Sequence, residues 1–305
     1  MARQAARRHR YGERPGVAYL FLSPWVAGVL LLTLGPMVAS LYLSFTDYDL
    51  FTAPAWIGWA NYHRMFVEDD RFIAAVGVSL RYVAFSVPMK LALALAVALL
   101  LNRASRALGF YRSAFYAPSL LGASVAVALV WRNIFDTGGL VPETLANLGI
   151  PTGTWVASPQ RALWVLVALA VWQFGAPMVI FLAGLKQIPT DLYDAAAVDG
   201  AGWWRGFRSI TVPMLSPVIF FNLVLETIHA FQAFTGAFIV SGGRGGPSDA
   251  TLFYTLYLYQ EGFRNFRMGY AAAMAWVLLI VIALVTALLF RTARIWVFYA
   301  GEDVR

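Results

Sequence analysis

The sequence contains no cysteine and few charged residues. Of its 305 residues, 13% are Asp, Glu, Lys or Arg, and only three are histidine. The absence of cysteine excludes disulfide bonds, thiolate catalysis and cysteine-ligated metals. The scarcity of charge argues against a water-soluble fold, because ordinary soluble domains carry about 25% charged residues. Hydrophobic residues, in contrast, are abundant and make up 60% of the sequence.

Long apolar runs occupy most of the chain. A helix needs about 20 apolar residues to cross the hydrocarbon core of a bilayer. Six runs reach this length and predict an all-α, polytopic membrane protein with transmembrane helices at 17–43, 76–101, 111–135, 163–185, 214–238 and 270–290. The runs contain prolines, which membrane helices tolerate where neighbours satisfy the freed carbonyls, so kinked helices around a cavity are expected. The first run is too long for a signal peptide and is interpreted as a span.

The distribution of Lys and Arg predicts the orientation. Fourteen of these residues fall on the side of both termini, eight fall on the opposite side, and Lys90 lies within a span. Because cytoplasmic segments are enriched in Lys and Arg, both termini are expected in the cytoplasm. The chain then divides into a basic cytoplasmic tail, a first span, an external loop, a core of five spans and a second cytoplasmic tail, at 1–15, 16–43, 44–75, 76–290 and 291–305.

The core contains one external loop of note, residues 239–269. Its aromatic-rich stretch, 250–263, is too short to span a membrane. This stretch is predicted to form an interfacial or re-entrant helix.

The connection between the fourth and fifth spans, residues 185–213, is the most informative segment. Thr190 is a candidate N-cap, and Asp191 and Asp194 suit the first turn of a helix. Alanines follow, and Gly200 is expected to break the helix. A short helix with small side chains that projects from the membrane is suited to a groove in another protein. An amphipathic helix lying on the membrane surface is the alternative.

This segment also resembles a known family. Asp194-Ala195-Ala196, then Gly200 after three residues, then Ile210 to Pro213 after nine, match the spacing of the EAA loop of binding-protein-dependent importer permeases. Asp194 and Val212 stand where the family usually has Glu and Leu. In that family the loop is the coupling helix that docks on a cytoplasmic ATPase. The resemblance therefore assigns ATPase coupling to Asp194, Ala195, Ala196, Asp199, Gly200, Ile210 and Pro213.

The resemblance covers most of the chain and points to the carbohydrate branch, that of maltose and glycerol-phosphate importers. The sequence around Gly245-Gly246-Pro247 and at 266–273 is similar to that branch. The resemblance implies a MetI-like bundle with the first span as a peripheral addition, in a bacterial or archaeal cytoplasmic membrane. It also implies a second permease subunit in a heterodimer, two ATPase domains or subunits, an extracytoplasmic solute-binding protein and a sugar-like solute.

Several features bear on chemistry within the chain. The sequence lacks the GxxxxGK[ST] motif, so ATP and Mg are expected on the partner ATPase and no cofactor is expected on this chain. No nucleophile, base or metal cluster indicates an enzyme. A proton-coupled secondary carrier is the remaining alternative, because Lys90, Glu226 and His229 could relay protons. The loop 185–213 favours the importer, since such carriers need no ATPase-docking motif.

Polar residues recur on one face of the fifth span. Asn222, Glu226, His229 and Ala233 follow helical spacing, and Gln232 lies beside them. This face could hydrogen-bond a hydroxyl-rich solute, whereas hydrogen bonding between helices is the alternative. The resemblance to the maltose-type permease matches Glu226, His229, Ala233 and, in the fourth span, Trp172 to sugar contacts.

Lys90 and Glu226 are predicted to form an intramembrane ion pair. Counted from the inner ends of their spans at 1.5 Å per residue, they lie at depths of about 16 Å and about 20 Å. Either charge alone would be costly in a bilayer.

Overall fold

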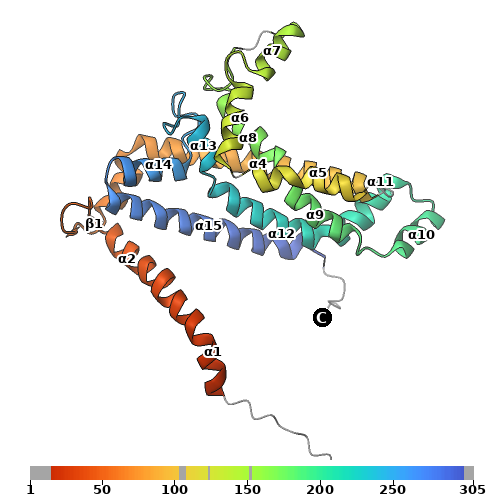
Figure 1. The fold of residues 1–305 in the computed structure, drawn as a ribbon. Helices are drawn as coiled ribbons and strands as arrows, with labels where there is room; N and C mark the ends of the chain where they lie inside the picture. Colours follow the sequence, from red (N-terminus) through yellow and green to blue (C-terminus); the bar gives the residue numbers. More distant parts are fainter. Residues whose placement is uncertain (1–14, 103–107, 123, 151–152, 299–305) are drawn as a thin grey trace, which may run out of the picture.

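The computed structural model describes residues 15–102, 108–122, 124–150 and 153–298. This part of the chain is mostly helical, and its long helices after the first span form one bundle (Figure 1). The predicted tail at 1–15 lies outside the described residues except for Pro15, and the tail at 291–305 is described as far as Phe298, with the last helix continuing to Trp296.

Four helical runs are long and apolar enough to cross a membrane. They are Tyr19–Ser44, Asp70–Asn102, Trp203–Val240 and Met268–Trp296, and they correspond to the first, second, fifth and sixth predicted spans. Their elements, with η denoting a π-helical segment, are α1 (Pro15–Gly28), η1 (Val29–Leu34), α2 (Gly35–Ser44), α4 (Asp70–Asn102), α11 (Trp203–Gly206), η3 (Phe207–Thr211), α12 (Val212–Phe231), α13 (Thr235–Val240) and α15 (Met268–Trp296).

The third and fourth predicted spans are each broken. Residues Gly109–Leu121 and Val125–Asn147 are bent by 96°, and residues Ala162–Trp172 and Gly175–Leu185 are bent by 42°. The elements are α5 (Leu108–Leu121), α6 (Val125–Phe135), α7 (Leu140–Asn147), α8 (Ala162–Trp172) and α9 (Gly175–Leu185). If each bent pair is one span, the number of spans is six, as predicted.

The first span touches the bundle at only one end. In Figure 1, α2 meets α15 at the end of the bundle, whereas α1 lies apart from the other helices. The adjoining loop forms a two-stranded antiparallel sheet, β1 (Thr46–Asp47) with β2 (Ala55–Trp56), followed by α3 (Ala60–His63) and η2 (Arg64–Glu68). Gly269 allows α15 to approach this loop, because a Cβ there would clash with the carbonyl oxygen of Thr46 on β1.

A second loop returns to the bundle between the fifth and sixth spans. Its two short helical elements are α14 (Tyr254–Tyr259) and η4 (Gln260–Arg264). Buried side chains such as Leu256 and Tyr257 pack this segment against α4 and α15. Neither element is among the described helices that are long and apolar enough to cross a membrane, as expected for 250–263. We call the end of the bundle that carries residues 44–69 and 241–267 the outer end, and the end that carries α10 (Thr190–Val198) the inner end.

Two apolar cores stabilise the bundle. The outer core includes Phe72, Leu166 and Met274, and the inner core includes Leu91, Phe181 and Leu215. Because α4, the α8–α9 pair and α12 contribute to both cores or pack against them, the same three elements also bound the space between the cores.

Candidate functional site

A cavity lies where the two cores meet. Its volume is about 470 Å³, within the size range of ligand pockets in proteins. Tyr82, from the outer core, and Val87, from the inner core, both line it. The remaining lining residues come from α4, α5, the α8–α9 bend, α12, α13 and the start of α14.

Lys90 and Glu226 form an ion pair in the wall of this cavity. The Nζ atom of Lys90 on α4 lies 2.7 Å from Oε2 of Glu226 on α12, and the two side chains are 15% and 12% exposed. The contact predicted from the two depths is therefore present. Since charges that are nearly buried need a partner, the pair makes both residues tolerable at this depth. Together they add no net charge to the cavity.

The predicted pathway residues divide into two groups. Glu226, His229 and Ala233 line the cavity, one helical turn apart on α12 and just beyond its end. Asn222 does not line it, because it is 2% exposed and its Nδ2 donates to the carbonyl of Val218 at 3.0 Å. Asn222 thus bonds to the backbone of its own helix, and this bond is neither a cavity contact nor the bond between helices that was the alternative.

Gln232 and Trp172 also lie off the cavity. Gln232 is exposed where α12 ends, and the Trp172 ring packs 5.5 Å from that of Trp131. Of the four residues predicted to share the polar face of the fifth span, only Glu226, His229 and Ala233 therefore line the cavity. The reason is that Asn222, one turn before Glu226, is buried within the bundle, and Gln232 is exposed where α12 ends.

The bend between α8 and α9 contributes a wall that sequence reasoning missed. The Ser119 hydroxyl on α5 donates to the carbonyl of Gln173 at 2.9 Å and accepts from the backbone N–H of Ala176 at 2.9 Å. All three residues line the cavity. Gly175 makes the close approach possible, because a Cβ there would lie 2.7 Å from Cα of Tyr116. Glycine and proline interrupting an apolar run were the available signal, since interrupted spans often line binding cavities.

At the inner end, the helix expected at residue 190 is present as α10. Its N-cap position is Pro189 and not Thr190, which corrects the predicted cap. Proline has an extended conformation here, and no side-chain bond caps the helix. Asp191 lies in the first turn, whereas Asp194 lies beyond it.

Gly200 ends α10 in a Schellman motif. The N–H of Ala201 bonds to the carbonyl of Ala196 at 2.9 Å, and the N–H of Gly200 bonds to that of Ala197 at 3.0 Å. Gly200 has φ of +75°, a conformation that costs other residues roughly 1–2 kcal/mol. The glycine at this spacing is therefore required by backbone geometry.

Most of α10 stands away from the core, and Tyr193 is the side chain of this helix that packs against the inner core. All nine of its side chains are exposed or half-buried, including Ala195. Its tertiary hydrogen bond runs between the Tyr193 hydroxyl and Oγ1 of Thr211, 2.9 Å apart. Of the other residues assigned to coupling, Asp199 and Gly200 are exposed, and Ile210 and Pro213 are half-buried where the fifth span begins. The residues predicted for coupling thus lie on α10, on the turn that follows it and at the start of the fifth span.

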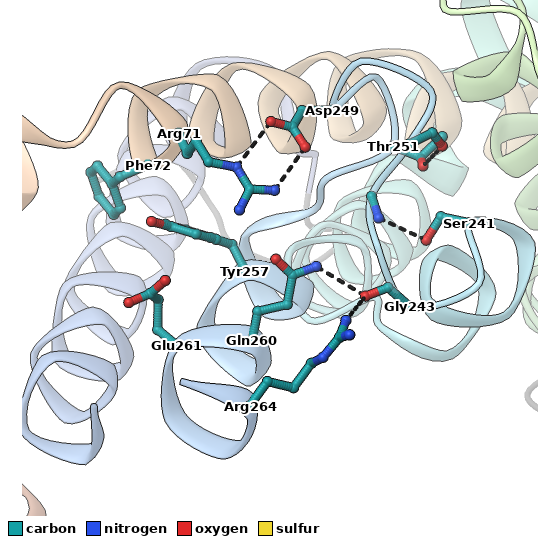
Figure 2. Close-up of polar contacts among 12 residues, drawn as sticks. Arg71, Phe72, Ser241, Gly243, Asp249, Thr251, Tyr257, Gln260, Glu261 and Arg264 are labelled. Carbon is teal, nitrogen blue, oxygen red and sulfur yellow. Dashed lines mark hydrogen bonds and ion pairs between the residues drawn. The ribbon is translucent and has the colours of Figure 1, made fainter. Parts of the chain in front are cut away.

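The outer end carries a dense polar network instead. In Figure 2, Arg71 on α4 reaches across to Asp249, with Nη2 to Oδ1 at 2.8 Å and Nε to Oδ2 at 3.0 Å. Gln260 and Arg264 converge on the carbonyl of Gly243, each at 3.0 Å. These bonds fix the loop 241–253 against α4 and α14. Sequence reasoning missed the network, because the partners are far apart in the chain.

Asp69 joins three segments of the outer end. Its carboxylate accepts hydrogen bonds from the hydroxyls of Tyr270 and Tyr257 at 2.6 and 2.7 Å, and from the N–H of Phe72 at 3.0 Å. Burial raises the pKa of Asp69, but these bonds and the charge of Arg64 outweigh it, so the pKa is lowered overall. Asp69 is therefore held as a carboxylate.

Comparison with known proteins agrees with this architecture. Residues 82–295 match the family described as binding-protein-dependent transport system inner membrane component. The chain is 50% identical over 286 residues to the probable ABC transporter permease protein YesP of Bacillus subtilis (strain 168), covering 93% of each. It is 31% identical over 286 residues to the lactose transport system permease protein LacF of Rhizobium radiobacter, covering 90% of this chain and 93% of that protein.

A solved structure has the same fold. A chain of a bacterial ABC transporter involved in the import of the acidic polysaccharide alginate superposes with a TM-score of 0.79, at 21% identity, over 92% of this chain and 96% of that chain. The predicted all-α membrane bundle is confirmed.

Proposed function

The chain belongs to the binding-protein-dependent transport system inner membrane component family, with its MetI-like bundle, and from this membership we propose that it forms half of the pathway of an ATP-driven sugar importer. It is a transport permease and not an enzyme. Its partners are a second permease subunit, two ATPase domains or subunits that bind ATP and Mg, and an extracytoplasmic solute-binding protein. It lies in a bacterial or archaeal cytoplasmic membrane with both termini in the cytoplasm.

The cavity between the two cores is the observation that carries the pathway. It combines hydrogen-bonding groups of Lys90, Glu226, His229 and Gln173 with the rings of Phe234 and Phe253. Apolar and aromatic walls with a few polar groups suit a hydroxyl-rich solute. The predicted solute contacts Glu226, His229 and Ala233 belong to this wall, whereas Trp172, Asn222 and Gln232 do not.

Thiol labelling tests the pathway. The native chain has no cysteine, so each variant carries a single thiol. Ala230→Cys and Ala233→Cys place a thiol at the cavity wall, and Asn222→Cys is the matched buried control on the same helix. We expect a water-soluble thiol reagent to label the two wall positions in at least one transport state and to spare Asn222→Cys. Protection of all three positions would contradict the pathway.

Coupling to the ATPase is supported by the projecting segment at the inner end. A helix with nine exposed or half-buried side chains and few tertiary bonds needs contacts from another chain to transmit force. The partner proposed for it is the ATPase.

Two substitutions of Gly200 separate bulk from backbone strain. Both Gly200→Trp and Gly200→Ala place a side chain on a residue with φ of +75°, so both introduce the same backbone strain. A Cβ at Gly200 has no described atom of this chain within 4 Å. Added bulk therefore acts on a partner. We expect Gly200→Trp to abolish ATP hydrolysis stimulated by loaded binding protein, whereas Gly200→Ala retains most of it. Normal stimulation in Gly200→Trp would refute docking at this segment.

The energy source separates the importer from a proton-coupled carrier. Uptake into vesicles should require ATP and persist after the proton gradient is collapsed. Uptake driven by the proton gradient without ATP would favour the carrier.

A further inference from the structure

A groove lies at the outer end, apart from the cavity described above. It has a volume of about 410 Å³ and shares no lining residue with that cavity. One wall is a single face of α4, another is the start of α8, and the loop after α13 closes the third side. The lining residues are Ala74, Val78, Arg81, Phe85, Pro159, Gln160, Leu163, Trp164, Ser248, Asp249 and Ala250.

Arg81 places a positive charge in this groove. Its Nε donates to the carbonyl of Gly77 at 3.2 Å, so the side chain runs back toward the outer end. The groove also contains a carboxylate, Asp249, but both of its oxygens are bonded to Arg71. Arg81 makes no ion pair with any carboxylate in the described part of the chain. The groove therefore has an uncompensated cation.

The position of Arg81 along α4 lets the end of its side chain reach the headgroup region of a bilayer. The 33 residues of α4 span about 50 Å at 1.5 Å per residue, about 20 Å more than the hydrocarbon core. If the excess is shared between the two ends, Arg81, about 16 Å from the start of α4, lies roughly 6 Å below the edge of the core. A side chain directed outward spans that distance and reaches the headgroups.

The groove also changes in polarity along its length. Its outer part has Ser248, Asp249 and Gln160, and its deeper part has Leu163 and the ring pair of Phe85 and Trp164, with centroids 4.9 Å apart. The two rings are 44% and 40% exposed. Tryptophan is enriched at the membrane–water interface, where its ring meets both environments. A ligand that fits both parts is polar at one end and apolar at the other.

We propose that this groove binds one phospholipid, with the phosphate on the Arg81 guanidinium and an acyl chain against Phe85 and Trp164. Arginine recognises phosphate through several parallel N–H donors, so its guanidinium suits the phosphate of a lipid headgroup. A sugar could stack on Trp164 but would leave the arginine without an anion. The proposal depends only on the membrane location of the bundle, so it does not require the solute to be a sugar.

Lipid titration of the assembled importer tests this site. The purified complex that contains the full-length chain is titrated with phosphatidylglycerol, and bound lipid is counted by native mass spectrometry. We expect Arg81→Gln to weaken the tightest lipid site roughly tenfold, the effect of losing a charge-assisted bond. Arg161→Gln is the matched control, because Arg161 is an outer-end arginine that stacks over Trp155 and does not line the groove.

A second variant keeps the charge and removes the space. Ala74 is exposed on the groove face of α4, so Ala74→Leu should fill the groove without disturbing the core. It should also lose the tight lipid site, while sugar transport in either variant reports separately on the proposed function. Lipid binding equal to that of the native chain in both variants would overturn the proposal. The proposal would also be overturned if Arg161→Gln weakened the tight lipid site as much as Arg81→Gln does. It would be overturned as well if soluble glycerol phosphate bound the site as tightly as the phospholipid, or if an oligosaccharide occupied it.

Discussion

The two ends of this molecule hold their functional segments in opposite ways. At the outer end, the loop 241–253 is bonded to α4 and α14 through Arg71–Asp249 and through the bonds to the Gly243 carbonyl. At the inner end, α10 has exposed or half-buried side chains and is tied to the fifth span by the Tyr193 hydroxyl. A loop with internal bonds keeps its shape alone, whereas a projecting helix needs a partner to complete its contacts. The difference predicts that substitutions at the two ends will affect different measurements.

The largest effect is expected between the two ends, at the Lys90–Glu226 pair. Lys90→Met should destabilise the folded protein by about 3–5 kcal/mol, because it leaves the carboxylate without its partner. Combining it with Glu226→Gln should recover most of that loss. A double-mutant cycle on thermal stability in nanodiscs measures the coupling, and strictly additive effects would show that the contact does not contribute.

The next largest effect is expected at Asp69. Asp69→Asn should cost about 2 kcal/mol, because hydrogen bonds to a charged acceptor are worth more than those to a neutral one. The lowered pKa also sets a direction with pH. Its stabilisation is complete above the unfolded pKa of about 3.9 and is lost as pH falls through the lower folded value.

Thermal stability of the outer end between pH 6 and pH 3 measures this dependence. The native chain should lose stability in the acid part of that range, and Asp69→Asn should lose less. Parallel curves for the two proteins would mean that Asp69 is not the titrating group.

A smaller effect is expected at the inner end from Tyr193→Phe. This substitution removes the bond to Thr211 and should cost about 1 kcal/mol locally. Hydrogen exchange of residues 190–200 should accelerate about fivefold, while the melting temperature of the bundle stays the same. A fall in the melting temperature comparable to that of Asp69→Asn would remove the distinction between the two ends.

The smallest effect is expected from Asp194→Glu, which introduces the residue usual in the EAA loop. Asp194 is exposed on α10, so its replacement should change stability by less than about 0.5 kcal/mol. ATP hydrolysis stimulated by binding protein should be retained. A large loss of that activity with unchanged stability would show that the ATPase surface distinguishes the two carboxylates.

Periodicity and length were sufficient to predict most of the architecture. Six apolar runs of spanning length, and Gly200 at the end of an alanine-rich turn, are local properties of the chain, and both are present in the structure. Local rules were weaker at helix ends, as with Thr190, where Pro189 has the extended conformation of the cap position. The depth argument for Lys90 and Glu226 succeeded because rise per residue is constant along a helix.

The sequence by itself determined the class of protein, the positions of the long apolar helices, the projecting helix and the pairing of Lys90 with Glu226, because these depend on residue type and on distance along one helix. Only the tertiary structure decided which side chains share a cavity. Whether Asn222 or Ala233 faces it depends on the rotation of α12 against its neighbours and on where α12 ends. The wall made by Ser119 and the α8–α9 bend, and the outer-end bonds of Asp69 and Asp249, join residues far apart in the chain. Such contacts are set by packing between helices, which no single stretch of sequence contains.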